Sequence, residues 1–545
     1  MQNAFTRWLF ASLAACLVAA QPALAAPGSP LVTPAWLKDE LAKGDVLLID
    51  TSPAKQHAAG HIPGAVHVDL YASGVHVLPP PALETRFQSW GLTPSRKVVV
   101  YDPGASMMAT WMFYELYHYG FPPEKLFLLD GGLETWKASG GAVTQHKTPA
   151  PAKGDFRITQ TREDVRVRLP EFLVASGDPA RHALVEALEP NYHFGESKFF
   201  DRAGHVPNAV MMPTADFFNA DKTFKSPEEI RRMATYFGIK PEQQVSSYCG
   251  GGVAATVPFF ALKFVADYPH VKVYKESQME WLRDDRNLPM WSYSAPYLKR
   301  EVSWLNGWGS PMMRMFNVAN VSVVDVRPAE QFGLGHVPYA LSIPDDVFRK
   351  HLREPAELAQ VLGPAGVDAA HEAVIMSSGG VNAASALAFV MLEKLGQKKV
   401  SIVMDSVDEW GLQGLPLTKE PTLVGPPKAP PAMTVLPTTY PKAARAGVLV
   451  RDARATAGAY PKVFLAAGVK PPATAPDGKV VHVPYTDLLD AKGAPKPAAE
   501  VWKILVKAGV PRYAEIICIA DDPGEAAIGY YVLRLMGYPD VKVLV

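Results

Sequence analysis

Residues 244–256 read Gln-Val-Ser-Ser-Tyr-Cys-Gly-Gly-Gly-Val-Ala-Ala-Thr, and the fold is best worked out from this stretch. Residues 244–248 are predicted to form a strand and residues 254–264 a helix, so Cys249 stands at the turn between them. Backbone N–H groups and the positive end of a helix dipole stabilise a thiolate, or an anion beside it, at such a turn. Three consecutive glycines let the backbone curl round a ligand without Cβ clashes. We interpret Cys249 as a reactive, exposed thiol; the alternative is a buried structural cysteine.

The same order of elements occurs four times along the 545 residues. Each copy starts with an apolar strand and continues through a His-Ile/Val-Pro element, or a remnant of it, to a helix and a second apolar strand. A turn and another helix follow. The four turns fall at Asp102, Cys249, Ser378 and Asp521 (or Asp522). Their separations are far longer than the period of a solenoid, so each copy is predicted to be a whole domain.

Strands that alternate with helices predict an α/β fold in which each copy forms a mainly parallel sheet with helices on both faces. We expect four tandem domains, at 30–150, 155–295, 300–424 and 432–545. Proline-rich stretches predict linkers near 148–152, 293–300 and 425–431. In the fourth copy, the first strand is predicted at 448–452 and the remnant of the His-Val-Pro element at 482–484.

The N-terminus is typical of a processing signal. Arg7 and the apolar residues 8–20 precede a small-residue cleavage site at Ala25, so residues 1–25 are predicted to be a signal peptide. We therefore expect an exported, periplasmic protein without a transmembrane segment. Anchoring as a lipoprotein through Cys16 is the less favoured alternative.

Charge and cysteine content narrow the function further. Lys+Arg and Asp+Glu both number 54, and this zero net charge argues against a nucleic-acid partner. Cleavage after Ala25 leaves Cys249 and Cys518 as the cysteines of the mature chain. A disulfide between them is not expected, because they occupy similar places in separate domains. Cys518 falls inside an apolar strand and is predicted to be buried.

These ordered elements resemble the rhodanese superfamily. Residues 31–295 are similar to the tandem sulfurtransferases that act on thiosulfate or mercaptopyruvate, in which a domain without cysteine packs against one that carries it. Asp102 after an apolar strand is similar to the first domain of such a pair, and residues 224–230 followed by Cys249 are similar to the second. The resemblance implies that Cys249 takes sulfur from a small anion, forms a persulfide and passes the sulfur to a thiol or cyanide. It implies no metal or organic cofactor.

The resemblance also nominates residues that bind the donor. The loop residues expected to hold the anionic sulfur are Gly250, Gly251, Gly252, Val253 and Ala254. The loop is closer to that of mercaptopyruvate enzymes, although Gly251 lacks the hydroxyl found there. The Arg that the family places after the first strand of the second domain is missing. Arg202 and Lys198 are the nearest candidates to hold an anionic donor, and an ordinary solvated charge is the alternative for both.

Histidines divide into one catalytic candidate and several structural ones. His76 lies in the segment 75–79, which in mercaptopyruvate enzymes brings a histidine to the cleft between the domains. Its implied role is proton transfer to the leaving group or the thiol, and a hydrogen-bonded loop histidine is the alternative. His61, His205 and His336 recur in copies without a nucleophile, so we expect them to be structural.

The residues at the four turns also bear on other possible functions. The Cys249 turn contains no Arg or Lys, which argues against the rhodanese-like phosphatases, whose longer loop ends in Arg. Ser378 and Asp521 predict that the third and fourth copies are inactive and serve to stabilise the first pair or to bind a protein partner. The alternatives to a sulfurtransferase are a non-catalytic persulfide carrier or scaffold, and a cysteine-based oxidation sensor.

Overall fold

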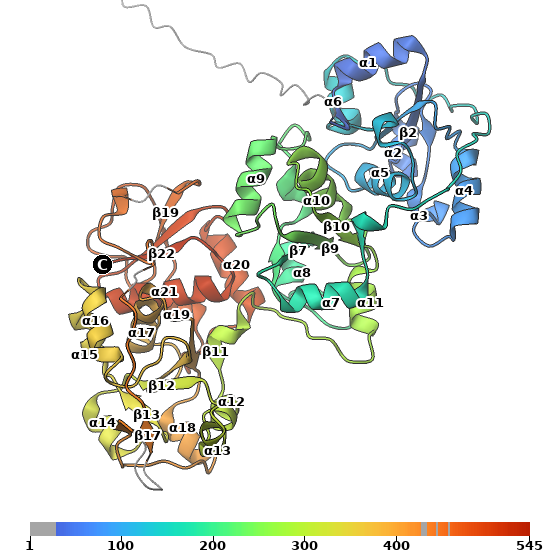
Figure 1. Ribbon diagram of the computed structural model, residues 1–545. Helices are drawn as coiled ribbons and strands as arrows, with labels where there is room; N and C mark the ends of the chain where they lie inside the picture. The colour runs from blue at the N-terminus through green and yellow to red at the C-terminus, as the bar shows by residue number, and fades with distance from the viewer. Residues whose placement is uncertain (1–28, 427–432, 443–444, 456–457) are drawn as a thin grey trace, which may run out of the picture.

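The computed structural model describes residues 29–426, 433–442, 445–455 and 458–545. Within these residues, four five-stranded parallel sheets follow one another along the chain, and helices flank them (Figure 1). A short ladder between β16 (Leu423–Val424) and β17 (Thr434–Val435) forms a separate two-stranded sheet. The predicted α/β class with parallel sheets is confirmed. We call the four sheets with their helices units 1 to 4.

Unit 1 has its strands in the order β1-β5-β4-β2-β3. These strands are β1 (Leu31–Val32), β2 (Val46–Asp50), β3 (Val66–His67), β4 (Lys97–Tyr101) and β5 (Leu126–Leu129). The helices are α1 (Pro34–Lys43), α2 (Ala54–Ala59), α3 (Leu70–Ser73), α4 (Pro80–Ser89), α5 (Met108–His118) and α6 (Gly132–Ala138).

Unit 2 repeats this order as β6-β10-β9-β7-β8. Its strands are β6 (Arg166–Val167), β7 (His182–Glu186), β8 (Ala209–Met211), β9 (Gln244–Tyr248) and β10 (Val271–Tyr274). Its helices are α7 (Leu169–Gly177), α8 (Pro190–His193), α9 (Pro227–Tyr236), α10 (Thr256–Phe260) and α11 (Ser277–Arg283).

Unit 3 has the order β11-β15-β14-β12-β13. Its strands are β11 (Lys299–Arg300), β12 (Val321–Asp325), β13 (Ala340–Ser342), β14 (Glu372–Met376) and β15 (Lys399–Val403). The helices are α12 (Val302–Trp308), α13 (Pro311–Met315), α14 (Ala329–Leu334), α15 (Asp345–Lys350), α16 (Pro355–Leu362), α17 (Ala383–Lys394) and α18 (Val407–Leu412).

Unit 4 has the order β18-β22-β21-β19-β20. Its strands are β18 (Leu449–Val450), β19 (Lys462–Ala466), β20 (Lys479–His482), β21 (Glu515–Ile519) and β22 (Val541–Leu544), and its helices are α19 (Tyr485–Leu488), α20 (Ala498–Ala508) and α21 (Pro523–Leu535). In all four units, the predicted turn follows the central strand, which is β4, β9, β14 or β21. These strands are buried along most of their length, as expected for a sheet that is covered on both faces.

The units pack in two pairs. α5 of unit 1 lies against α10 of unit 2, where Thr110 Oγ1 and Thr256 Oγ1 are 2.9 Å apart. α17 of unit 3 lies against α21 of unit 4, where the rings of Phe389 and Tyr531 meet edge to face at 5.0 Å. Each pair shares one continuous hydrophobic core. The tandem-pair organisation of the N-terminal half therefore recurs in the C-terminal half.

The first strand predicted for the fourth copy is in the wrong place. Residues 448–452 contain β18, an edge strand that pairs with β22 and corresponds to β1 of unit 1. The counterpart of β2, which lies beside the central strand β4, is β19, which pairs with β21. β2 ends on Asp50 whereas β19 ends on Ala466. The acidic residue that marks this strand end in the other copies is therefore missing from the fourth.

The predicted His-Val-Pro remnant of the fourth copy is also a different element. His482 is the last residue of β20 and pairs in register with Ala466, as His67 pairs with Asp50 in unit 1. Nε2 of His482 and Nε2 of His67 each lie within hydrogen-bond distance of a carbonyl oxygen, at 3.1 Å and 2.9 Å. His482 therefore corresponds to His67 and not to His61.

The predicted linkers and termini are only partly described. Residues 148–161 contain no helix or strand, in agreement with a linker there. The linker predicted at 293–300 is wrong at its end, because β11 enters the sheet of unit 3 beside β15. Most of 425–431, and the whole predicted signal peptide 1–25 with Cys16, lie outside the described residues. No helix in the described part of the chain is long and apolar enough to cross a membrane.

Candidate active site

Cys249 directly follows β9, and the turn that it opens ends where α10 begins at Thr256. β9 matches the predicted strand, whereas the helix starts two residues later than predicted and continues as a π-helical segment, Ala261–Val265. The N–H of Gly252 donates to Cys249 Sγ at 3.1 Å. Gly252 has φ 83°, and a Cβ there would lie 1.9 Å from the carbonyl oxygen of Lys275. Only glycine fits this position of the turn.

The thiol is buried, which contradicts the exposed thiol predicted from the sequence. Cys249 is 3% exposed, because side chains from other segments close over the turn. Burial raises the pKa of the Cys249 thiol above its ordinary value. The backbone N–H groups of Ala255, Gly251, Gly252 and Ala254 lower the pKa, but they do not offset the burial. Three of the five loop residues that were predicted to hold the anionic sulfur therefore interact with Sγ through their N–H groups. Ala255, which was not predicted, does so as well.

The start of α11 holds the backbone of the turn in place. The N–H of Cys249 donates to Ser277 Oγ at 3.0 Å, and the N–H of Gln278 donates to the Cys249 carbonyl at 3.1 Å. In the sequence, residues 274–281 have counterparts after the first and third turns, at 129–136 and 404–410, and each of the three segments ends in a tryptophan that is predicted to pack in the core. Trp281 is buried, as predicted. The recurrence after every turn but the last was also the signal for the backbone support that the sequence analysis missed.

Three apolar side chains border the turn. A Cβ on Gly250 would lie 2.8 Å from the ring of Phe199, and a Cβ on Gly251 would lie 3.0 Å from Met279 Cε. Tyr71 reaches over from α3 of unit 1: burial and the negative charge of the Cys249 thiolate both raise the pKa of its phenol. All three side chains are themselves partly exposed to solvent. The side chains next to the turn are therefore mainly apolar, and a phenol of unit 1 lies close enough to interact with Cys249.

A buried chain of ionisable groups links His76 to the loop across the boundary between the units. Lys275, whose backbone carbonyl lies against Gly252 of the turn, donates from Nζ to Glu115 Oε2 of unit 1 at 2.9 Å. Glu115 Oε1 lies 3.3 Å from His76 Nδ1, and both carboxylate oxygens are buried. Burial alone would raise the pKa of Glu115, but Lys275 and His76 together hold it below its ordinary value. His76 also packs edge-on against Trp111, as Tyr71 does.

The structure thus brings His76 to the contact between units 1 and 2, and its catalytic role stays a prediction. Glu115 and Lys275 were not nominated from the sequence. Glu115 lies in the middle of an apolar helix, α5, where a lone carboxylate needs a buried partner. A single carboxylate in an otherwise apolar helix is the sequence signal that could have identified Glu115.

Arg202 and Lys198 are placed less favourably as donor ligands. The Arg202 guanidinium donates to the carbonyl oxygen of Leu282, near the C-terminal end of α11, at 3.4 Å. It also donates to the carbonyl oxygen of Leu288, beyond that helix, at 2.6 Å. The backbone of Cys249 is held at the near end of that helix. Lys198 is exposed and precedes Phe199, which covers Gly250. Anion binding by either residue stays a prediction.

Parts of the chain match known proteins. The model of the rhodanese-like domain matches residues 33–139 and 311–413. A probable 3-mercaptopyruvate sulfurtransferase of Pseudomonas aeruginosa is 32% identical over 279 residues, which cover 47% of this chain and 96% of that protein. The chain belongs to the rhodanese superfamily.

Two further relatives differ in their names. The sulfur carrier protein TtuD of Thermus thermophilus is 28% identical, and the match covers 46% of this chain and 93% of that protein. The thiosulfate sulfurtransferase of Azotobacter vinelandii is 27% identical, with 46% and 93% covered. Each of these relatives has about half the length of this rhodanese-superfamily chain.

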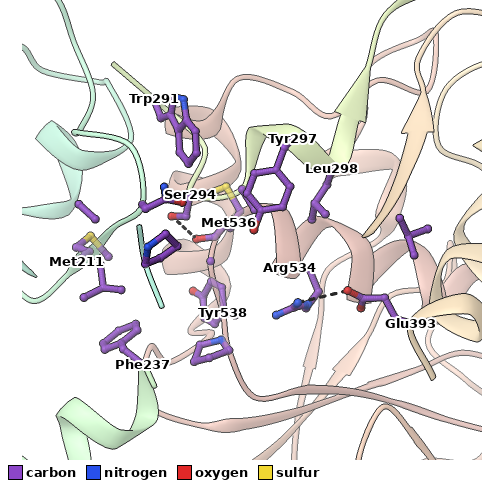
Figure 2. A pocket seen from close by; sticks show the side chains of 18 of the residues that line it. Met211, Phe237, Trp291, Ser294, Tyr297, Leu298, Glu393, Arg534, Met536 and Tyr538 are labelled. Carbon is purple, nitrogen blue, oxygen red and sulfur yellow. Dashed lines mark hydrogen bonds and ion pairs between the residues drawn. The ribbon is translucent and has the colours of Figure 1, made fainter. Parts of the chain in front are cut away.

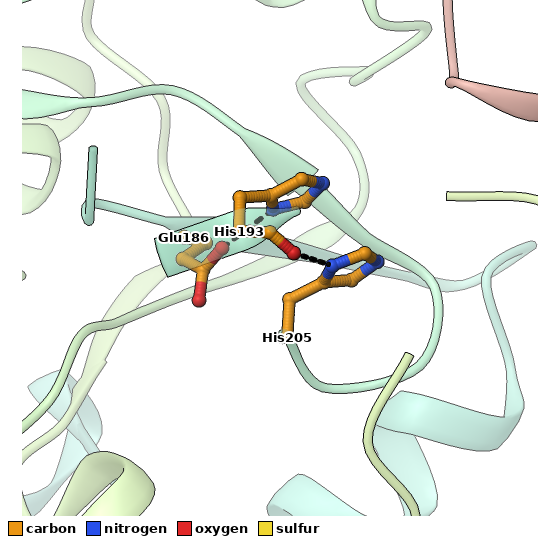
Figure 3. A group of neighbouring side chains, drawn as sticks. All are labelled: Glu186, His193 and His205. Carbon is orange, nitrogen blue, oxygen red and sulfur yellow. Dashed lines mark hydrogen bonds and ion pairs between the residues drawn. The ribbon is translucent and has the colours of Figure 1, made fainter. Parts of the chain in front are cut away.

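A second cluster of ionisable groups, Glu186, His193 and His205, lies in the interior of unit 2 (Figure 3). Their ligand-type atoms lie within 4.8 Å of one another, which raises the question of a metal site. The lone pairs are largely used within the protein: His193 Nδ1 lies 2.5 Å from Glu186 Oε2, and its Nε2 lies 3.2 Å from Ser294 Oγ. The two imidazole rings stack in parallel at 3.6 Å, so their nitrogens do not converge on one point.

The same arrangement recurs in unit 1, where Asp50 binds His57 at 2.7 Å and His57 stacks on His61 at 3.8 Å. The cluster is therefore a structural feature of the repeated unit. The structural role predicted for the repeated histidines agrees with their contacts: Nδ1 lies 2.8–3.0 Å from a backbone carbonyl oxygen in each of His61, His205 and His336.

The turns of units 3 and 4 carry no thiol. A Cβ on Gly380, next to the Ser378 turn, would lie 2.5 Å from the carbonyl oxygen of Lys492 in unit 4. In unit 4, Asp522 caps α21 and pairs with Arg349 of unit 3 at 2.7 Å. Cys518 is fully buried in β21, and both described cysteines are free, as predicted.

Proposed function

We propose that the chain is an exported sulfurtransferase that moves sulfane sulfur from thiosulfate or 3-mercaptopyruvate to a thiophilic acceptor through a persulfide on Cys249. The observation that carries this proposal is the convergence of backbone N–H groups on Cys249 Sγ in the turn after β9. Such N–H groups can stabilise negative charge both on Sγ of the thiolate and on the outer sulfur of the persulfide, one atom further out. The sulfurtransferase relatives support the same chemistry.

In the first step, the Cys249 thiol loses its proton, and Sγ attacks the outer sulfur of the donor. With thiosulfate, the new Sγ–S bond forms as the S–S bond breaks, and sulfite leaves with the electron pair. With mercaptopyruvate, the C–S bond breaks, and the carbon keeps the electron pair and takes up a proton to give pyruvate. We assign the proton transfer to His76, which Glu115 orients through the 3.3 Å contact.

In the second step, a thiolate or cyanide attacks the outer sulfur of the persulfide, and Cys249 leaves as the thiolate. Both steps conserve electrons overall, because the sulfur moves as a neutral atom between two nucleophiles. The expected kinetics are ping-pong.

The test is turnover of each donor by the mature chain and by Cys249→Ser, with a mass spectrum of the intact protein after exposure to each donor. The proposal expects turnover and one extra sulfur atom on the wild type, and neither on the variant. Loss of His76 is tested separately with His76→Ala, for which an unchanged rate would remove His76 from the reaction.

The second candidate function is a persulfide carrier. The similarity to a sulfur carrier protein and the cover of Phe199 and Met279 over the turn favour it. A carrier would load sulfur on Cys249 without multiple turnovers with cyanide or small thiols. Loading without turnover would therefore select this function over the enzyme.

The domain organisation belongs to the same proposal. Units 1 to 4 are inferred to be four tandem rhodanese-like domains, at 30–150, 155–295, 300–424 and 432–545, and the shared strand order supports this. Domains 3 and 4 are inferred to be inactive and to stabilise the first pair or bind a protein partner. Export through a signal peptide at 1–25 is tested by sequencing the N-terminus of the protein recovered from the periplasmic fraction.

A further inference from the structure

A cavity of about 760 Å³ lies where units 2, 3 and 4 meet (Figure 2). Met211 and Phe237 line it from unit 2, Glu393 from α17 and Arg534 from α21. Its volume falls in the range of about 300–1,000 Å³ that is typical of sites for small organic ligands. None of the residues that line it belongs to the Cys249 turn. It is therefore a different site from the one that carries the proposed sulfur transfer.

Aromatic rings form much of the wall. Trp291 and Tyr297, on the segment that joins units 2 and 3, lie 6.1 Å apart, and Tyr297 is about half exposed. Phe194 of unit 2 stacks on Trp502 of α20 at 5.0 Å. Rings of this kind provide large, rigid contact areas, which suit a ligand with a flat apolar body.

One guanidinium in the wall has donors to spare. Arg534 Nη2 donates to Glu393 Oε1 at a long 3.4 Å, and Figure 2 shows the guanidinium directed into the cavity. Glu393 is also held by Tyr530, whose hydroxyl donates to Oε2 at 2.6 Å. Arg534 Nε is buried and has no hydrogen-bond partner among the described residues. A guanidinium offers five N–H donors, so most of its capacity is unused.

The charged side chains that line the cavity also favour an anionic ligand. The cavity is lined by six cationic side chains, Arg300, Lys398, Lys399, Arg445, Arg512 and Arg534, and by two carboxylates, Glu372 and Glu393. Arg300 is paired with Glu372, and Arg512 with Asp216. Even with these pairs, positive charge remains in excess around an apolar space, and this favours an anionic ligand.

We propose that this cavity binds a small organic anion with an aromatic body, whose carboxylate or sulfonate contacts Arg534 while its ring packs against Trp291 and Tyr297. The binding of such a ligand would hold unit 2 against the C-terminal pair, because the wall includes residues of all three units. The proposal does not depend on the chemistry of Cys249.

The first experiment titrates the mature full-length protein with 2-naphthoate and with its neutral isostere 2-naphthamide by calorimetry. Both probes have the same ring system, so the difference between them isolates the anion. A charge-assisted hydrogen bond to Arg534 predicts that the naphthoate binds about tenfold or more tightly than the naphthamide. Equal affinities, or no binding of either probe at millimolar concentration, would overturn the proposal.

The second experiment locates the site. Arg534→Met combined with Glu393→Gln removes both charges at once, so that no buried carboxylate is left unpaired. The advantage of naphthoate over naphthamide is expected to disappear, and Tyr297→Ala is expected to weaken both probes alike. Arg286→Met is the matched control, because Arg286 pairs with Asp284 on the surface of unit 2, away from the cavity lining. Retention of the naphthoate advantage in the double variant, with its thermal unfolding unchanged, would contradict the assignment to Arg534.

Discussion

The turns of units 2 and 4 occupy the same place in two sheets of the same strand order, yet only one is suited to nucleophilic chemistry. In unit 2, backbone N–H groups surround Cys249 Sγ, and the borders of the turn are apolar. In unit 4, the turn places Asp521 and Asp522 at that position, and Asp522 is neutralised by Arg349 of the neighbouring unit. The sheet therefore supplies the position, and the side chains of the turn and of the partner unit decide its use.

The largest effect is expected from a change of Cys249, the proposed nucleophile. Cys249→Ser should lower the turnover of either sulfur donor by a factor of about 10³ or more, because serine forms no persulfide. The reciprocal change, Asp521→Cys, should not create a second active turn. Gly524 there packs against Ala383 of unit 3, with only 2.7 Å from its would-be Cβ to Ala383 Cβ. Sulfur loading of the Asp521→Cys variant, measured by mass spectrometry in a Cys249→Ser background, would contradict this comparison.

The ion pairs between the units should differ strongly in their effect on stability. Glu115→Gln leaves Lys275 buried and unpaired, and we expect a loss of about 3–5 kcal/mol in the free energy of unfolding. Asp522→Asn breaks a pair that is more than one-third exposed, and the expected loss is about 1 kcal/mol or less. Denaturant unfolding of both variants makes the comparison.

A control separates the missing charge from a disturbed core. Glu115→Gln with Lys275→Met removes both charges and should recover much of the stability. If the double variant were as unstable as Glu115→Gln, the loss would come from packing rather than from the unpaired Lys275.

A smaller effect on turnover is expected when a hydroxyl is introduced at position 251. A serine there would bring its Cβ to within 3.0 Å of Met279 Cε. Gly251→Ser alone should therefore lower turnover severalfold through crowding, and Met279→Ala in the same chain should restore it. Steady-state rates with mercaptopyruvate measure both variants. A Gly251→Ser variant as active as the wild type would show that Met279 does not restrict this position.

The smallest effect concerns the pH at which Cys249 reacts. Because burial raises the pKa of this thiol, the thiolate fraction and the alkylation rate should rise with pH through a midpoint above the ordinary value of about 8.5. Iodoacetamide labelling of a Cys518→Ala variant, followed between neutral and alkaline pH, isolates Cys249 in the mature chain. A midpoint below that value would mean that the N–H groups outweigh the burial.

Much of the fold followed from local patterns. The strand before Cys249 was predicted at the residues that form β9, because the run of three glycines after Cys249 marks the end of a regular element. The same reasoning failed in unit 4, where β19 ends on Ala466 and lacks the acidic marker of the other copies. Edge strand β18 was then mistaken for the counterpart of β2, since periodicity alone does not report a strand's neighbours.

The sequence by itself determined the position of the Cys249 turn, its recurrence in four copies and the parallel α/β class, because each depends on residues close together in the chain. Tertiary structure alone decided the burial of Cys249, the interaction of Tyr71 with Cys249 and the Lys275–Glu115–His76 chain of ionisable groups. Glu115 and Lys275 are 160 residues apart, and their pairing arises only because α5 and α10 pack the two units together. A long-range contact between single charges leaves no period and no spacing in one sequence, whereas its energy depends on the burial that packing provides.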